Sequence, residues 1–212
     1  MKNFDNSFLS ESISLIAGID EAGRGPLAGP VVAASVVFRP DTYIVGVNDS
    51  KKVKEALREE LYGEIISRAL CWSVGIIDQE EIDRINILQA TLLAMKNSSE
   101  QLTVKPDLLI VDGNKLFYSD LPAKCIVKGD EKSFSIAAAS ILAKVTRDRL
   151  MKGYAEQYPM YLWHKNKGYA TREHIDALLK YGPCPLHRKT FIKNFMEGEQ
   201  NEFNFQQSRT RG

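Results

Sequence analysis

The sequence predicts an α/β domain of three layers, with a five-stranded mixed sheet at its centre and a helical appendage at its C-terminal end. Two β-branched segments, 15–19 and 31–38, follow one another without a helix between them, whereas the later strands alternate with helices. The run 108–111 is apolar throughout, which is typical of a central strand covered on both faces. Together these patterns favour a sheet that contains both antiparallel and parallel pairs.

Length and composition suit one globular domain with a small appendage. The chain has 212 residues, of which 44% are hydrophobic and 26% charged. No apolar run approaches the ~18 residues of a membrane span, and residues 1–14 are polar, so we expect a soluble, cytoplasmic protein that does not enter a membrane. The three cysteines lack metal-ligand spacing and are expected to be reduced: Cys71, Cys125 and Cys184.

The first half of the chain is predicted to form a hairpin followed by helices and one strand. Segments 15–19 and 31–38 form the hairpin, and a glycine-rich turn joins them. A helix is expected over about 51–70, because apolar residues recur at every fourth position, and Asp49 or Ser50 can cap it. Strand 71–77 then leads into one long helix that opens with acids at 78–81.

The second half supplies two more strands and a helix rich in small residues. Strand 108–111 ends at Asp112 and Gly113, and strand 123–127 ends at a charged turn that contains Asp130. The helix from 131 to about 154 has small side chains in its first half, which let it lie close to a sheet. We therefore expect an N-terminal extension over 1–14, a catalytic domain over 15–155, a helical substrate-binding appendage over 156–195, including a helix near 172–181, and a flexible tail over 196–212.

Four carboxylates are expected to meet at one edge of the sheet. Asp20, Glu21, Asp112 and Asp130 all follow strands and stand beside glycine or a turn. Two carboxylates about 4 Å apart repel by roughly 4 kcal/mol at an effective dielectric near 20, so a fold gathers acids around a cation or a shared proton. Oxygen ligands without histidine or cysteine suit Mg²⁺ or Mn²⁺, and four negative charges balance two such ions. Two metal ions can activate a water and stabilise the leaving oxygen of a phosphodiester, which predicts hydrolysis of a nucleic-acid backbone.

Each acid also has a structural alternative. Asp20 can cap a turn while Glu21 faces water, Asp112 can be an ordinary strand-end residue, and Asp130 can be the N-cap of the helix from 131. Asp148 stands between two arginines and is interpreted as an ion-pair partner. The metal-site hypothesis therefore depends on the whole set.

The net charge of +1 does not by itself indicate a nucleic-acid partner, but the C-terminal region is basic. Between 160 and 195 there are seven Lys or Arg residues against two acids. A solvated basic face is the alternative reading of such a cluster. The basic residues are Lys165, Lys167, Arg172, Lys180, Arg188, Lys189 and Lys193.

An ordered series of motifs resembles the bacterial ribonuclease HII family. It begins with Gly18-Ile19-Asp20-Glu21-Ala22-Gly23-Arg24-Gly25-Pro26 and covers roughly residues 15–195. A single Gly-Arg-Gly or Asp-Gly would be weak evidence, whereas the series in matching order is specific. The matching segments are 18–26, 48–52, 111–114, 128–130, 138–148, 167–169 and 187–191.

The resemblance implies a ribonuclease H-like fold and endonucleolytic cleavage of RNA in RNA/DNA hybrids, including nicking 5′ of single ribonucleotides embedded in duplex DNA. Asp20, Glu21, Asp112 and Asp130 match the family's metal-binding and catalytic carboxylates. The implied cofactor is Mg²⁺ or Mn²⁺ at a two-metal site, and the implied products carry 3′-hydroxyl and 5′-phosphate ends. We expect a monomer, and the sequence identifies no protein partner.

The resemblance also implies the substrate contacts. Gly23, Arg24 and Gly25 match the loop that recognises the ribonucleotide 2′-hydroxyl partly through its backbone, which glycines permit. Tyr169 matches a tyrosine that stacks on the following sugar. Ser50, Lys51 and Arg188 are expected at backbone phosphates, as are some of Lys144, Arg147, Lys165 and Lys189. For the three histidines a surface role is expected rather than catalysis: His164, His174 and His187. His187 alone lies in a matching motif, where orienting the substrate and packing both stay open.

Two other readings of function stay open. A non-catalytic module that binds RNA/DNA hybrids would carry the same basic appendage, although it would not need all four acids. A nucleotide-binding protein that holds phosphate at the glycine turn is less consistent with the sequence, because the turn lacks Gly-Lys-Ser/Thr and the neighbouring acids repel phosphate. The related ribonuclease HIII type is disfavoured because little chain precedes residue 15.

Overall fold

The computed structural model describes residues 1–47, 50 and 53–196, so the expectations for Asp49, Lys51 and the tail from 197 lie outside the described residues. Five strands form a single sheet: β1 (Ile16–Ala22), β2 (Val31–Val37), β3 (Cys71–Ile77), β4 (Leu108–Asp112) and β5 (Ala123–Ile126). Their order is β3-β2-β1-β4-β5, with β1, β2 and β3 antiparallel and with β4 parallel to both β1 and β5. The predicted mixed five-stranded sheet is confirmed.

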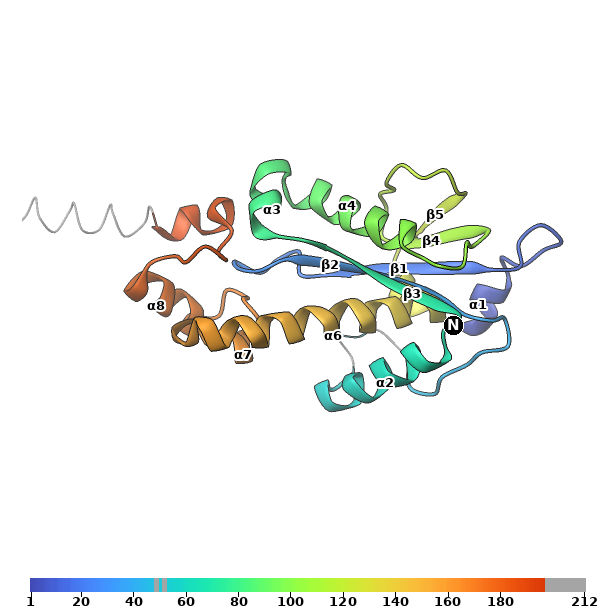
Figure 1. The fold of residues 1–212 in the computed structure, drawn as a ribbon, viewed down its shortest axis with the longest axis horizontal. Coiled ribbons are helices and arrows are strands. Elements are labelled where there is room, and N and C mark those ends of the chain that lie inside the picture. Colours follow the sequence, from blue (N-terminus) through green and yellow to red (C-terminus); the bar gives the residue numbers. More distant parts are fainter. Residues whose placement is uncertain (48–49, 51–52, 197–212) are drawn as a thin grey trace, which may run out of the picture.

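Helices cover both faces of this sheet and complete the three layers (Figure 1). One face carries α3 (Gln79–Ile85) and α4 (Ile87–Glu100), and the other carries α2 (Glu55–Arg68) and α6 (Phe134–Gln157). The shorter helical elements include α1 (Lys2–Asn6), α5 (Gly129–Lys132), η1 (Pro159–Tyr161), α7 (Trp163–Asn166) and α8 (Arg172–Tyr181). Helix α8 has the bounds that the sequence predicts.

The alternation of side chains along β2 divides the core between these two layers. Ala33 and Val37 pack with α4, whereas Ala34 and Val36 pack with α2 and α6. Both faces of the strand are therefore buried, which explains why it is apolar at nearly every position.

The prediction of one continuous helix from residue 78 onward is wrong, because the structure has two helices there, α3 and α4. Asn86, between them, has a φ of 68°, and its side-chain oxygen accepts hydrogen bonds from the backbone N–H groups of Leu88 and Gln89. Asparagine tolerates positive φ and is a favoured N-cap, so it ends one helix and begins the next.

Two further helix boundaries differ from the predictions. Helix α2 begins at Glu55, so Val53 lies outside it and Leu57 is exposed, while Leu61 and Ile65 form the buried stripe. The helix expected from 131 is divided at Ser133, whose hydroxyl accepts from the Ile136 N–H and caps α6.

Residues 1–14 pack against the domain. Asp5 in α1 is buried, and its carboxylate accepts hydrogen bonds from the backbone N–H and hydroxyl of Ser135, at 2.9 and 2.8 Å. Further on, Asp107 accepts from the Ser14 and Leu15 N–H groups. The carboxylate of Asp5 thus satisfies one of the free N–H groups in the first turn of α6.

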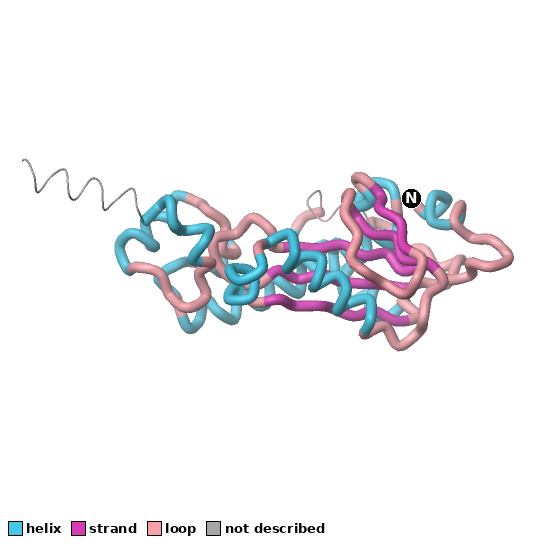
Figure 2. The backbone as a smooth tube through the Cα atoms, turned by 90° about the horizontal axis from the view of Figure 1, so that it is seen from above, coloured by secondary structure: helices cyan, strands magenta, loops and turns pink. Residues whose placement is uncertain are grey.

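The C-terminal helices gather at the end of the molecule that lies away from the N-terminus (Figure 2). They pack on the glycine-rich turn after β1, where Ala28 forms a bridge with His187 and the Leu27 N–H donates to the Gly168 carbonyl. Cys71, Cys125 and Cys184 are free thiols, as expected. Among the described residues, none of the helices has the length and apolarity needed to cross a membrane.

Candidate active site

Asp20 and Glu21 occupy the last part of β1, next to the turn that the sequence marks as glycine-rich. Asp20 is buried, with 5% of its surface exposed, and its carboxylate accepts a 2.7 Å hydrogen bond from the Glu21 N–H and a hydrogen bond from Ser140 of α6. Glu21 pairs with Arg24 at 3.4 Å. Both acids are thus held by short-range contacts at the end of a central strand.

Asp112 reaches the same edge because β4 runs parallel to β1. The register aligns Ile19 with Val111, so Asp20 and Asp112 follow at neighbouring strand positions. One Asp112 oxygen accepts a 2.6 Å hydrogen bond from the backbone N–H of Gly129. This bond brings the buried Asp130 of α5 next to β4.

The four carboxylates repel one another in a site that is partly closed to water. Burial, followed by the charges of Glu21 and Asp112, raises the pKa of Asp20 well above its usual range. Burial also raises the pKa of Glu21, although Arg24 opposes this, and that of Asp112, where Asp130 adds to the repulsion. Clustered negative charge with only oxygen donors is the environment that fits a hard divalent cation.

The acids share an edge without closing around a single point. Among the residues that the structure describes, no three His, Cys, Asp or Glu side chains are arranged to hold a metal ion as they stand. The alternative of Asp130 as a helix N-cap is wrong, because the N-cap of α5 is Lys128 and Asp130 lies inside the helix. Asp148 pairs with Lys144 at 2.7 Å, as the sequence predicts.

A cavity of about 80 Å³ adjoins Glu21 and Asp112 and shows which other groups face the site. Arg24 lines it on one side, and Asn114 and Lys115 line it from the loop after β4. The sequence assigns no role to Asn114 or Lys115, although their place directly after Asp112 and Gly113 is a usable signal. Apolar side chains of α4 complete the wall: Leu88, Leu92 and Met95.

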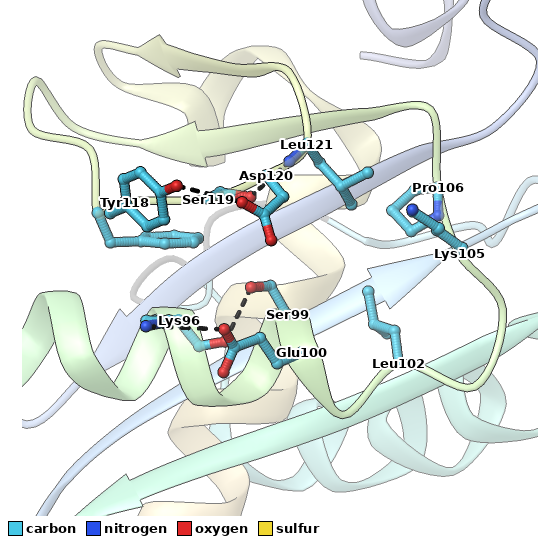
Figure 3. A pocket seen from close by; sticks show the side chains of 11 residues that line it. Lys96, Ser99, Glu100, Leu102, Lys105, Pro106, Tyr118, Ser119, Asp120 and Leu121 are labelled. Carbon is cyan, nitrogen blue, oxygen red and sulfur yellow. Dashed lines mark hydrogen bonds and ion pairs between the residues drawn. The ribbon is translucent and has the colours of Figure 1, made fainter.

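A larger pocket of about 380 Å³ lies elsewhere and contains none of the four acids (Figure 3). It opens between the end of α4 and the loop that leads into β5, where Lys96 pairs with Glu100 and the Tyr118 hydroxyl donates to Asp120. Its charged side chains are of both signs, two lysines and two acids, and contain no cluster of acids, so size alone does not identify the site.

The loop expected to read the sugar projects beside the acids. Gly23 is buried and has a φ of 96°, whereas Arg24 and Gly25 are exposed. A Cβ built on Gly25 would approach only the Tyr169 ring, at 4.0 Å. Tyr169 is 40% exposed, and its ring lies 5.8 Å from the Lys144 ammonium nitrogen. Gly25 and Tyr169 therefore border a common open surface.

Ser50 is placed differently from the expectation of a phosphate contact. It is buried, with 4% of its surface exposed, and its hydroxyl lies 2.8 Å from that of Ser140, which in turn bonds Asp20. The Ser50 carbonyl accepts a hydrogen bond from Arg58. Ser50 thus supports Asp20 through Ser140 from inside the protein.

Arg188 also differs from the expectation of a phosphate contact. Its side chain is fully buried and donates to the backbone carbonyls of Gly23, Arg24, Gly29 and Pro30. No phosphate can reach it in this position. The same is true of Arg147, whose guanidinium is also completely buried.

Two of the three histidines, His174 and His187, are buried. This contradicts the surface position expected for His174 and agrees with the packing alternative for His187. The Cys184 N–H donates to Nδ1 of His187, so His187 carries its proton on Nε2 and donates to Nε2 of His174. Trp163 also donates to that nitrogen, which leaves the His174 Nδ1–H to donate to the Tyr169 carbonyl at 2.9 Å. Both rings are therefore neutral, and burial with the neighbouring His174 lowers the pKa of His187 to about 4.

Comparison with known proteins gives a consistent result. The family model described as Ribonuclease HII matches residues 17–194. A ribonuclease HII of Caldicellulosiruptor saccharolyticus is 50% identical over 192 residues, covering 91% of this chain and 94% of that protein. The Clostridioides difficile ribonuclease HII is 54% identical over 193 residues, with 91% and 76% covered.

Solved structures show the same similarity at the level of the fold. Ribonuclease H2 from Pyrococcus horikoshii superimposes with a TM-score of 0.73 at 26% identity, covering 86% of this chain and 97% of that one. A ribonuclease HII of Archaeoglobus fulgidus, solved in complex with PCNA, gives a TM-score of 0.67 at 29% identity, covering 82% and 93%.

Proposed function

Since this chain belongs to the ribonuclease HII family, we propose that Asp20, Glu21, Asp112 and Asp130 form the catalytic centre with which it cleaves RNA in RNA/DNA hybrids. As a family member it is a metal-dependent hydrolytic endoribonuclease with a ribonuclease H-like fold. The observation that supports these residues is their shared sheet edge, where burial and mutual repulsion raise the pKa values of Asp20, Glu21 and Asp112.

The four carboxylates would hold Mg²⁺ or Mn²⁺, which suits their all-oxygen chemistry. Two such ions, when bound, would activate a water and stabilise the leaving 3′-oxygen. The chain's own part is to hold these oxygens in place: Ser140 and the Glu21 N–H orient Asp20, and the Gly129 N–H orients Asp112. No protein nucleophile is needed for this reaction.

The substrate would lie across the open surface between Gly25 and Tyr169. Backbone N–H groups of the loop 23–25 would donate to the 2′-hydroxyl, and Tyr169 would stack on the sugar that follows. The 2′-hydroxyl is absent from DNA, so this contact would permit nicking 5′ of a single ribonucleotide embedded in a DNA duplex. Excision of misincorporated ribonucleotides and removal of RNA primers are the processes that such cleavage would serve.

We also propose that residues 15–155 form the catalytic domain and that residues 156–195 form a substrate-binding appendage of the same domain. The appendage packs on the loop 23–30, as the contact between Leu27 and Gly168 illustrates. A monomer suffices, because one chain supplies all four acids. A cytoplasmic location remains a proposal consistent with a nucleic-acid substrate and free cysteines.

The test is cleavage of a DNA duplex with one ribonucleotide, in parallel with a long RNA/DNA hybrid, with Mg²⁺, Mn²⁺ or EDTA. We expect a nick 5′ of the ribonucleotide with 3′-hydroxyl and 5′-phosphate ends, and no cleavage in EDTA. A 2′,3′-cyclic phosphate product, or activity that survives EDTA, would contradict the proposed mechanism. Binding of hybrids without cleavage under every metal condition would instead favour a non-catalytic binding module.

A further inference from the structure

Two completely buried guanidinium groups lie beneath the loop 23–30. Arg147 belongs to α6 and Arg188 to the segment after α8, so residues far apart in the sequence meet under one turn. Burial lowers the pKa of Arg147 to about 10 and that of Arg188 to about 9, so both remain charged at neutral pH. A buried charge is stable only when its hydrogen bonds are satisfied, and here backbone carbonyls provide the acceptors.

The two arginines hold different carbonyls. Arg188 donates to the Gly23 carbonyl at 2.6 Å and to the Arg24 carbonyl at 2.9 Å. Arg147 donates to the carbonyls of Ala28 and Lys167, at 3.0 and 2.9 Å. Both also reach Pro30, and Arg188 reaches Gly29. Only Arg188 therefore bonds the two peptide groups inside the Gly23-Arg24-Gly25 motif.

This arrangement determines where the N–H groups of the motif point. In a trans peptide the carbonyl and the N–H lie on opposite sides, and the structure has no cis peptide among its described residues. The Gly23 and Arg24 carbonyls face the buried guanidinium, so the N–H groups of Arg24 and Gly25 face away from it. Those two residues are the exposed ones of the motif.

The positive charge of Arg188 has a second effect on these peptide groups. A cation that binds a carbonyl oxygen draws electron density along the peptide and strengthens the N–H as a donor. Two such donors on consecutive residues suit an acceptor oxygen that approaches from the exposed side.

The two glycines of the motif are needed for different reasons. A Cβ on Gly23 would collide with the Arg147 side chain, so Gly23 allows the guanidinium to approach the backbone. A Cβ on Gly25 would meet no atom closer than 4.0 Å, so packing within the chain does not require a glycine there.

We propose that Arg188 is a specificity-determining positioning residue, which turns the Arg24 and Gly25 N–H groups outward to receive the 2′-hydroxyl of a ribonucleotide. The inference rests on the proposed function of the loop and adds the group that orients it. Arg188 acts through the backbone and does not touch the substrate.

The experiment compares binding of two DNA duplexes that differ in one 2′-hydroxyl, measured by fluorescence anisotropy. The full chain carries Asp20→Asn, which is expected to prevent cleavage, and the ratio of Kd for the deoxy duplex to Kd for the ribo duplex is the readout. Addition of Arg188→Lys should lower this ratio by about tenfold, because an ammonium group keeps the charge but cannot span four carbonyls.

Arg147→Lys in the same background is the matched control. Arg147 is equally buried and its hydrogen bonds also go to backbone carbonyls, but none of them goes to the Gly23 or Arg24 peptide. Its guanidinium lies 5.8 Å from the Tyr169 ring, so a change in overall affinity is expected as well. It should weaken binding of both duplexes and leave the ratio within about twofold of the parent. An equal loss of the ratio in both variants would overturn the assignment to Arg188.

The outcomes separate this inference from the proposed function. If the parent does not distinguish the two duplexes, the proposed reading of the 2′-hydroxyl is wrong. If the parent distinguishes them and folded Arg188→Lys does so equally well, the inference alone is wrong. Should Arg188→Lys and Arg188→Gln both fail to fold, NMR of the wild-type chain decides: the Arg188 Nη hydrogens must exchange slowly with solvent, and exchange at the rate of a free guanidinium would refute the inference.

Discussion

Asp112 accepts a hydrogen bond from the backbone N–H of Gly129, with 2.6 Å between the oxygen and the nitrogen. The bond joins the end of β4 to the first residue of α5 and thereby sets the position of two proposed metal-binding acids, Asp112 and Asp130. Both the orientation of Asp112 and its distance from α5 depend on the absence of a side chain at residue 129.

Gly129→Ala should therefore impair cleavage without removing any carboxylate. A Cβ at this position would lie 2.6 Å from Ile136 and 3.2 Å from the Asp112 oxygen, so the carboxylate must move. We expect at least about a tenfold loss of kcat/KM and a higher metal concentration at half-maximal activity. Titration of activity with Mg²⁺ measures both.

Gly153→Ala is the control for that substitution. Gly153 is also helical, but a Cβ there would meet no atom within 4 Å. It should leave activity unchanged and stabilise the chain by about 0.5–1 kcal/mol, because alanine restricts the unfolded state. Equal activity of the two variants would show that Asp112 does not need its present position.

Asp20→Asn should abolish cleavage and, in EDTA, raise the melting temperature. Burial and neighbouring acids raise the pKa of Asp20, so its ionised form opposes folding at neutral pH when no metal is bound. Removal of the charge is expected to stabilise the metal-free chain by on the order of 1 kcal/mol, or about 2–4 °C. Thermal unfolding with EDTA and with Mg²⁺ provides the measurement, and Mg²⁺ should stabilise the wild type more than the variant.

Asp148→Asn supplies a control of opposite sign. Asp148 is a buried acid too, but Lys144 pairs with it at 2.7 Å, so loss of its charge should lower the melting temperature. A decrease for Asp20→Asn as well would mean that the Asp20 charge is compensated within the protein.

Stability should fall in acid partly through His187. Its folded pKa of about 4 lies below the unfolded value of 6.5, so the unfolded state binds the proton first as the pH falls. Above pH 6.5 neutral His187 contributes about 3 kcal/mol to the free energy of unfolding. This contribution is lost as the pH falls from about 6.5 to about 4.

His187→Asn isolates this effect, because asparagine keeps an acceptor for the Cys184 N–H and does not titrate. The raised carboxylate pKa values act in the opposite direction at low pH, so the difference between the two chains is the informative quantity. Urea unfolding at pH 7 and pH 4 should show a smaller loss for the variant. Parallel losses would exclude His187 as the titrating group.

Alanine at the two motif glycines should produce different defects. Gly23→Ala collides with Arg147 and requires a φ of 96°, so we expect loss of stability by more than about 1 kcal/mol. Gly25→Ala should melt normally and lose preference for the ribonucleotide duplex. Melting temperatures and cleavage of matched duplexes measure both, and a normal preference in Gly25→Ala would argue against approach of the sugar at this glycine.

The sheet was predictable from sequence because its signals are local. Apolar runs define the strands, and Asp112 ends one of them, so an acid at a strand end could be recognised without knowing its neighbours. The four acids share a sheet edge because the parallel strands end on the same side of the sheet. The strand order places these strand ends next to one another.

Roles that depend on distant partners could not be predicted in this way. Arg188 looks like a surface cation in a basic segment, and only the three-dimensional structure shows that its acceptors are carbonyls about 160 residues earlier in the chain. The choice between the open roles of His187 could not be made for the same reason, since its partners His174 and Cys184 become visible only in the structure. The break between α3 and α4 is different, because its signal, an asparagine at the N-cap of α4, is local. It was not predicted because the apolar stripe continues past Asn86.

The bond between Asp5 and Ser135 bears on how the nascent chain folds. Its two residues are 130 positions apart, so α1 leaves the ribosome long before its partner exists. Strands β1, β2 and β3 can pair early because they are consecutive and antiparallel, whereas β1 must wait for β4 and the opposite sheet face must wait for α6. A chain halted before α6 emerges would expose that apolar face, and the N-terminal segment would dock only when synthesis has passed Ser135.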